Sequence, residues 1–466
     1  MKASIQVNFT KKTGKKIMPL HGVNSGPMTK VFTYDARPLF VEGGIPLVRL
    51  HDSEYPYGSG EFIDIPCVFP NFDADENDPA SYNFGNTDEY IRQCLRVGSK
   101  ILYRLGVSIE HSPVKRYIHP PKDFEKWARI CEHIIRHYNE GWANGYEWGI
   151  EYWEIWNEAD LDRKSDNKRC WTGTAAQFFD LYSVTARHLK KCFPNLKIGG
   201  CGFTTSQNDF TEAFLEHISL QTPPVPLDFY SWHCYTSRPE VIVKKAEQGR
   251  MLLDRYGYSS AESILDEWNL VYSWDFENQA ESYRAMKDHR GAAFYAAALC
   301  AMQEHTDLSA ATQFEADVVK EFCGIFNVKN MSVGGLSAGG IGRCAELEPT
   351  KGFYALKSYN RLYRLGNQVE LLCNDNTLWA TAATADHGVG VIISNIENRD
   401  VSVSLSLLGV TDTIAVRITD HEHTDQKLLE MSAASPLSLS LEIPPQSFVY
   451  VGTEIPDPIY HESKNL

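Results

Sequence analysis

The sequence has no long apolar stretch of the kind that crosses or enters a membrane. No run of 18 apolar residues occurs, and the first residues, MKASIQVNFTKKTGKK, lack the apolar core of a secretion signal. Low-complexity tracts are also missing, and 43% of the 466 residues are hydrophobic, which excludes a mainly disordered chain. We therefore expect a folded cytoplasmic protein with one large domain and one smaller one.

Paired cysteines and an excess of positive charge are missing as well. The eleven cysteines are scattered without a C-x-x-C pair, which is typical of free thiols in a reducing compartment. The net charge is −15, because 60 acidic residues outnumber 45 basic ones. Such a chain does not attract nucleic acid or an anionic membrane, so we expect a small-molecule substrate as its partner and leave a homo-oligomer open.

The common signatures of nucleotide and metal binding do not occur either. The first apolar strand is not followed by G-x-G-x-x-G, and the chain has no G-x-x-x-x-G-K-[ST] and no H-E-x-x-H motif. We therefore predict no cofactor and no metal site.

The chain does show a regular alternation of short apolar strands with amphipathic helices. Strands are predicted at 17–26, 47–52, 100–107, 152–159, 197–203, 227–235, 263–270 and 309–317. Clear helical spacing covers 121–143, 175–193, 240–257, 291–305 and 352–366. Eight strands with crossover helices close a parallel barrel, so we predict an α/β fold, a (β/α)8 TIM barrel, for residues 18–366. An open doubly wound sheet is the main alternative.

The composition and the hydrophobic pattern of the sequence change after residue 366. Short alternating segments rich in Val, Ile, Ser and Thr, such as VSVSLSLL and LSLSLEIP, are separated by Asn, Asp, Gly and Pro. This pattern predicts a C-terminal β-sandwich and tail over residues 367–466. Residues 1–17 contain one more strand, SIQVNFT, which we expect to join the sandwich.

Polar residues gather where the predicted barrel strands end, which is where such barrels carry their active sites. Glu158 ends one strand and Glu267 ends another, three strand–helix units further along the chain, so the two carboxyls are expected to face each other across the barrel mouth. Opposed carboxylates beside aromatic rings suit glycoside hydrolysis, because apolar sugar faces stack on indoles. The rings available are Trp156, Trp232, Trp268, Tyr272 and Trp274.

The motifs at these strand ends resemble one family. W-N-E at 156–158 and D-E-W-N at 266–269 resemble the retaining (β/α)8 glycoside hydrolases of clan A. The R-x-H at 49–51, the H-x-Y at 233–235 and the trailing sandwich are most similar to family 39, the β-xylosidase and α-L-iduronidase group.

The resemblance implies roles for individual residues. Glu158 is expected to be the acid/base and Glu267 the nucleophile of a double displacement. The implied sugar-binding set is Asn157 for the 2-hydroxyl, Arg49 and Tyr235 on the nucleophile, His51 and His233 along the subsite, and Trp268 and Trp274 as platforms. Glu315 is expected either to bind a sugar hydroxyl or to close the barrel.

For two further acids, Asp266 and Glu154, the sequence pattern predicts no role in the site or only a weak one. Asp266 precedes the nucleophile, and strand alternation predicts that its side chain points away from the mouth, so no role is assigned to it. Glu154 shares the parity of Glu158 on its strand and is a weak candidate for an inward-facing role.

The predicted function is a retaining exo-acting glycoside hydrolase on short oligosaccharides or glycosides, with β-xylosidase as the first choice. A β-glucosidase, a β-galactosidase, an α-L-arabinosidase, an iduronidase-like enzyme, a silent carbohydrate-binding relative and a metal-dependent barrel hydrolase remain alternatives. Substrate choice is expected to depend on the loops at 53–85, 160–173 and 271–290. Arg163, Lys164 and Arg169 are candidate partners for a sugar carboxylate.

Overall fold

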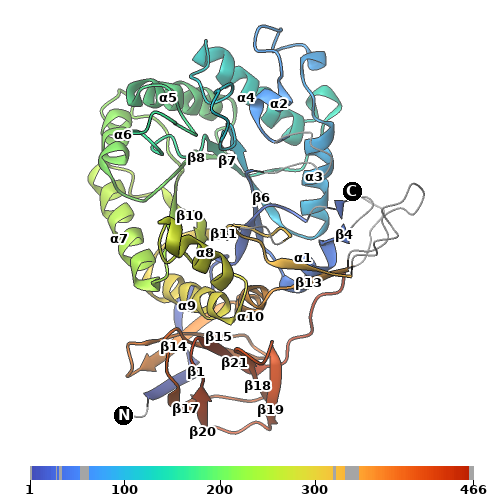
Figure 1. Ribbon diagram of the computed structural model, residues 1–466, viewed down its shortest axis with the longest axis vertical. Coiled ribbons are helices and arrows are strands. Elements are labelled where there is room, and N and C mark those ends of the chain that lie inside the picture. The colour runs from blue at the N-terminus through green and yellow to red at the C-terminus, as the bar shows by residue number, and fades with distance from the viewer. Residues whose placement is uncertain are drawn as a thin grey trace, which may run out of the picture.

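Eight parallel strands close a barrel in the computed structural model, which describes residues 3–27, 29–30, 34–52, 62–318, 322–330 and 346–460 (Figure 1). The barrel strands are β2 (Gly22–Asn24), β5 (Leu47–Leu50), β6 (Lys100–Leu105), β7 (Tyr152–Ile155), β8 (Lys197–Phe203), β9 (Phe229–Tyr235), β10 (Glu262–Asn269) and β11 (Leu308–Gln313). They pair in chain order, and β11 closes the ring on β2. The predicted TIM barrel is thereby confirmed, and the doubly wound sheet is excluded.

Helices surround the barrel on its outer face (Figure 1). They are α1 (Arg37–Gly43), α2 (Ile65–Val68), α3 (Gly85–Arg96), α4 (Phe124–Asn139), α5 (Ala175–Cys192), α6 (Asp209–Ser219), α7 (Pro239–Arg255), α8 (Phe276–Ala285), α9 (His289–His305) and α10 (Lys351–Leu365), with single 3-10 turns at Pro79–Ser81 and Trp142–Asn144. At the starts of α4, α5, α6, α8 and α9, a side chain accepts from backbone N–H groups that have no partner inside the helix. Asp123 accepts from Lys126 N at the start of α4, and Thr174 forms a capping box with Gln177 at α5.

A second layer of structure is a nine-stranded sheet with its own apolar core. Its strands are β1 (Ala3–Lys16), β14 (Asn367–Cys373), β15 (Leu378–Thr384), β16 (Val389–Asn395), β17 (Val401–Leu408), β18 (Ile414–Thr419), β19 (Gln426–Met431), β20 (Leu437–Ile443) and β21 (Ser447–Thr453). β1 pairs with β14 and β17. Residues of β18 and β20, which lie near opposite ends of the strand order, share one core cluster, so the sheet wraps round a common interior as a sandwich does.

Helices α9 and α10 lie between the barrel and this sheet (Figure 1). α9 is buried on almost every side, because the barrel covers one face and β15 and β16 cover another. The Ser394 hydroxyl of β16 donates to the Ala293 carbonyl of α9 at 2.7 Å. Two short hairpins, β3 (Thr29–Lys30) with β4 (Tyr34–Asp35) and β12 (Phe326–Asn330) with β13 (Glu346–Pro349), complete the described elements. None of the described helices is long and apolar enough to cross a membrane.

The structure differs from the sequence expectation mainly at strand ends. The predicted strand 17–26 is a ladder over Gly22–Asn24 alone, and the strand predicted at 309–317 stops at Gln313. Within the loop predicted at 53–85, residues 53–61 lie outside the described residues, and the remainder contains α2 and the turn Pro79–Ser81.

Candidate active site

The two predicted catalytic carboxyls lie together at the carboxyl ends of the barrel strands. Glu158 follows β7 and Glu267 lies near the end of β10, and both are buried together with His233 of β9. One carboxylate oxygen of each Glu and one ring nitrogen of His233 all lie within 4.8 Å of one another. Trp156 and Glu158 have left-handed backbone, with φ of 71° and 46°, so the W-N-E segment turns sharply and brings Glu158 into the mouth.

Both oxygens of Glu267 are held by buried donors. Arg49 Nη1 donates to Oε1 at 2.7 Å, and the Tyr235 hydroxyl donates to Oε2 at 2.7 Å. Burial raises the pKa of Glu267, while the charges of His233 and Arg49 act in the opposite direction and stabilise the carboxylate. The neighbouring acids Glu158 and Asp266 add to the effect of burial, so the carboxyl is fixed in orientation by its donors while its pKa stays raised.

His51 lies beside Glu267 as a neutral ring. Arg104 Nε donates to His51 Nδ1 at 3.2 Å, which places the ring proton on Nε2. That Nε2 lies 3.3 Å from Asp52 Oδ1 and 3.5 Å from Glu267 Oε1. Burial and the charges of Arg49 and Arg104 hold the pKa of His51 well below its usual range. His51 is thus an uncharged ring whose Nε2 faces the carboxyls of Asp52 and Glu267.

Glu158 is paired with His233. His233 Nδ1 lies 2.9 Å from Glu158 Oε1, whereas Oε2 of the same carboxyl lies 3.9 Å from the Cys170 thiol. Burial alone would lower the pKa of His233, but the carboxylates of Glu267 and Asp266 and the bond to Glu158 together raise it well above its usual range. Its Nδ1 also lies 3.4 Å from Glu267 Oε2, so the ring faces both catalytic carboxyls.

A second layer of charged groups lies beneath the two catalytic carboxyls. Arg49 Nε donates to Glu154 Oε2 at 2.7 Å and lies 3.0 Å from Asp266 Oδ2. The Ser231 hydroxyl donates to Glu154 Oε1 at 2.5 Å. Glu154, Asp266 and Arg49 have no exposed surface. Glu154 is therefore a buried part of the site, although its strand pattern alone made it only a weak candidate.

The prediction that Asp266 points away from the mouth was wrong. The pairing of β10 with β9 shifts register between Leu265 and Glu267, so strand alternation is broken at Asp266 and two successive acids face inward. The glycines of β8 could have indicated the buried charged groups beneath the catalytic carboxyls from the sequence. A Cβ on Gly202 would lie 2.8 Å from Arg49 Nη2 and 3.2 Å from Asp266 Oδ2, so glycine makes the space that these groups occupy.

Asn157 lies at the edge of this network with one group unused. Its Oδ1 accepts from Arg49 Nη2 at 2.7 Å. Its buried Nδ2 has no hydrogen-bond partner among the described residues. An oriented amide with a free N–H beside the nucleophile is suited to a ligand hydroxyl, the contact predicted for Asn157.

The prediction of Trp268 as a sugar platform was wrong. Trp268 has no exposed surface and packs on α9, with its ring 5.5 Å from that of Tyr295. Neighbouring residues of a strand point to opposite faces, so an inward Glu267 turns Trp268 outward. Trp156 and Trp232 are buried in the same way, and their indole N–H groups donate to the Cys170 carbonyl and the Ser263 hydroxyl.

Trp274 is the indole that the structure places at the mouth. It is 54% exposed, and its ring lies 5.4 Å from that of Tyr235, which itself bonds Glu267. Glu315 is buried near the end of β11, where it accepts from the Ser25 hydroxyl at 2.8 Å and lies 3.2 Å from the Cys323 thiol. These contacts link the ends of β2 and β11, and a sugar-binding role for Glu315 stays a prediction.

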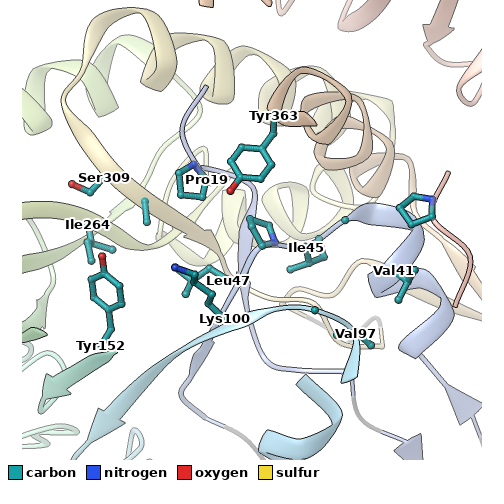
Figure 2. Close-up of a pocket in the computed structure, with 15 residues that line it drawn as sticks. Pro19, Val41, Ile45, Leu47, Val97, Lys100, Tyr152, Ile264, Ser309 and Tyr363 are labelled. Carbon is teal, nitrogen blue, oxygen red and sulfur yellow. The ribbon is translucent and has the colours of Figure 1, made fainter. Parts of the chain in front are cut away.

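A cavity of about 370 Å³ lies at the opposite end of the barrel (Figure 2). Leu47, Lys100 and Tyr152, the first residues of β5, β6 and β7, line it together with Ile264 and Tyr363. It lies at the amino ends of the strands and contains none of the catalytic carboxyls. We therefore place the candidate active site at the carboxyl end.

Comparisons with known proteins identify a family and several similar structures. The model of the glycosyl hydrolases family 39 matches residues 60–405. A β-xylosidase from Geobacillus stearothermophilus is 28% identical over 252 residues, which are 47% of either chain, so the match spans about half the length of that relative. A glucosidase structure from Croceicoccus marinus covers 98% of this chain and all of its own at 22% identity and a TM-score of 0.74. A monomeric β-xylosidase from Caulobacter crescentus covers 96% of this chain and 99% of its own at 16% identity and a TM-score of 0.64.

Proposed function

The chain belongs to glycosyl hydrolase family 39, and on this premise we propose that it is a retaining, exo-acting β-xylosidase for short oligosaccharides or glycosides. The curated relative that it matches at 28% identity is a β-xylosidase. The carboxyl pair at the barrel mouth supplies the chemistry that this proposal needs.

The spacing of the two carboxyls carries the proposal. Retaining glycosidases hold their two carboxyls about 5–5.5 Å apart, whereas inverting enzymes separate them by about 6.5–9.5 Å to admit a water molecule. An oxygen of Glu158 and an oxygen of Glu267 lie within 4.8 Å of each other, which supports direct attack by a carboxylate.

The reaction then proceeds in two displacements at the anomeric carbon. Glu158 gives its proton to the leaving oxygen while the Glu267 carboxylate attacks, so the glycosidic bond breaks and a glycosyl ester forms. In the second step Glu158, now a carboxylate, takes a proton from water, whose oxygen attacks the anomeric carbon and releases Glu267. Arg49 and Tyr235 orient the nucleophile in both steps, and the Asn157 amide N–H is positioned for the sugar 2-hydroxyl.

The charges round the mouth support a neutral sugar. Glu267, buried at the mouth, acts as a carboxylate in the proposed mechanism and would repel a uronate. Two of the cations considered for a sugar carboxylate are paired elsewhere, since Arg163 bonds Asp209 and Arg169 bonds Asp162. Lys164 is solvent-exposed in the same loop. An iduronidase-like activity is therefore disfavoured relative to a neutral pyranosidase.

The proposal is tested by a release assay over aryl β-xyloside, β-glucoside, β-galactoside and α-L-arabinoside, with EDTA present. We expect wild type to release the aryl group from the xyloside first and to form β-xylose before mutarotation, as proton NMR detects. Glu267→Ala should lose activity. The matched control is Glu262→Gln on the same strand, which pairs with Lys197 away from the site and should stay active.

Each other result points to a stated alternative. A different preferred glycoside would name a β-glucosidase, a β-galactosidase or an α-L-arabinosidase. Loss of activity with EDTA would indicate a metal-dependent barrel hydrolase. Binding of xylose-containing oligosaccharides without turnover would indicate a silent relative, and formation of α-xylose would contradict retention.

A further inference from the structure

His233 lies between two sets of carboxyl groups. The upper level is the catalytic pair Glu158 and Glu267 at the mouth, and the lower level is Glu154 and Asp266 beneath it. On the mouth side, its Nδ1 lies 2.9 Å from Glu158 Oε1 and 3.4 Å from Glu267 Oε2. On the barrel side, its Nε2 lies 3.6 Å from Asp266 Oδ2. The ring, which is 1% exposed, therefore joins a buried acid of the lower level to the acid/base of the upper level.

Asp266 lies close to His233 because strand β10 departs from regular pairing with β9 at this residue. The register shift between Leu265 and Glu267 turns its carboxyl inward, where Arg49 and His233 are its charged neighbours. A regular strand would point this side chain away from the barrel interior, and the catalytic Glu267 would then lack an acid beneath it.

We propose that Asp266 is a positioning residue that holds His233 as an imidazolium against Glu158. The assignment rests on the proposed function, because it takes Glu158 as the acid/base. Asp266 itself does not touch the substrate in this account. It acts on the reaction only through the ring of His233.

The charge distribution of the lower level supports this assignment. Arg49 and His233 hold the pKa of Asp266 below its usual range although burial opposes them. Burial and the neighbouring Asp266 raise the pKa of Glu154 to about 8, with Arg49 acting against them. Within this coupled pair, Asp266 is the acid whose neighbours favour the charged form.

The remaining groups that face His233 fit the same picture. Glu267 adds a second negative charge, and the nearest histidine, His51, is neutral because its pKa is lowered. Arg49 opposes protonation of the ring but is itself matched by Glu154, Asp266 and Glu267. Removing Asp266 therefore removes a main source of the field that keeps His233 charged.

An imidazolium at this position stabilises the carboxylate that Glu158 becomes when it gives up its proton. Its Nδ1–H donates to Oε1, which leaves Oε2 to carry the proton that goes to the leaving oxygen. When that proton departs, the new carboxylate keeps a charge-assisted hydrogen bond from His233, and the ring retains its own proton throughout. The benefit is largest for a leaving group that requires protonation.

The dependence on the leaving group gives a test that a structural role would not reproduce. We expect Asp266→Asn to lower kcat for xylobiose about 10- to 100-fold and kcat for 2,4-dinitrophenyl β-xyloside less than about threefold, because the activated phenolate leaves without acid assistance. KM for each should change little. Equal loss on both substrates would overturn the proposal.

A second measurement is independent of turnover. NMR titration of the His233 ring should show a pKa at least about one unit lower in Asp266→Asn than in wild type, and an unchanged pKa would also overturn the proposal. If wild type hydrolyses no glycoside, the proposed function is wrong. The titration would still show whether Asp266 keeps the ring of His233 charged. Asp266→Ser serves in the same assays if Asp266→Asn does not fold.

Two further variants distinguish the Asp266–His233 contact from the general effect of removing a buried negative charge near the site. Asp160 is a buried acid two residues past Glu158, and it is bonded to Thr204 and Asn208. Asp160→Asn should change both rates by the same factor. The double variant Asp266→Asn, His233→Gln should be no slower on xylobiose than His233→Gln alone, whereas additive losses would show that Asp266 acts by another route.

Discussion

The two ends of the barrel differ in what they bury. At the amino end, Leu47, Leu102, Phe229, Ile264 and Ala310 form an apolar cluster beside a cavity. At the carboxyl end, the same strands bury Arg49, Glu154, His233, Asp266 and Glu267. Burying charges costs free energy even when they are paired, whereas apolar burial stabilises the fold. The amino end thus stabilises the fold. This stabilisation offsets the cost of burying the reactive charged groups at the carboxyl end.

The backbone shows the same contrast. Among the described residues, nine residues other than glycine are left-handed, and four of them, Ser25, Asp52, Trp156 and Glu158, follow the carboxyl ends of barrel strands with φ between 46° and 71°. Such conformations cost about 1–3 kcal/mol each and persist only where the surrounding structure enforces them. The comparison teaches that irregular backbone and buried charge occur together, on the side of the barrel that carries the chemistry.

The largest effect should follow from removing the cation that the charged end shares. Arg49→Met leaves Glu154, Asp266 and Glu267 without their common partner, and breaking a buried pair costs about 3–5 kcal/mol. We also expect kcat/KM to fall by about 100-fold or more, since Glu267 loses an oriented donor. Urea unfolding and steady-state kinetics measure the two effects, and Arg49→Lys, which retains the charge, should lose less stability.

A change at the apolar end should affect stability and leave catalysis alone. Ile264→Ala enlarges the existing cavity and should lower the free energy of unfolding by about 2–5 kcal/mol, while Ile264→Val should cost about 0.5–1.5 kcal/mol. Both should retain the wild-type kcat and KM at a temperature where they are folded. A large fall in kcat of the folded Ile264→Val protein would contradict the separation of the two ends.

Much of the fold followed from the sequence because the barrel strands are continuous apolar runs bounded by breakers. The strand predicted at 197–203 is β8 residue for residue, and the helix predicted at 175–193 is α5 to within one residue. The prediction of family 39, made from R-x-H, H-x-Y, E-W-N and the trailing sandwich, is confirmed. The roles assigned to Glu158 and Glu267 are supported by the way the strands bring these residues together, and they await kinetic tests.

The errors arose where a local pattern does not determine side-chain direction. Trp268 was taken from its motif as a platform, although its parity relative to Glu267 already turned it outward. Asp266 was placed outward by regular alternation, but a register shift in β10 reverses that. The contact of Glu154 with Arg49 joins residues 105 positions apart, so no pattern within one strand could reveal it.

The smallest expected effect concerns a single acid at the rim of the charged end. Burial and the charge of Glu267 raise the pKa of Asp52 to about 7, above its value in an unfolded chain. Its ionisation therefore disfavours the folded state, and stability is lost as the pH rises from about 4 to about 7. Because its side chain is 26% exposed, we expect Asp52→Asn to raise the free energy of unfolding by only about 1 kcal/mol at pH 8 and by nothing measurable at pH 4. Urea unfolding of both proteins at the two pH values tests this, and a gain of equal size at both would show that ionisation of Asp52 is not its cause.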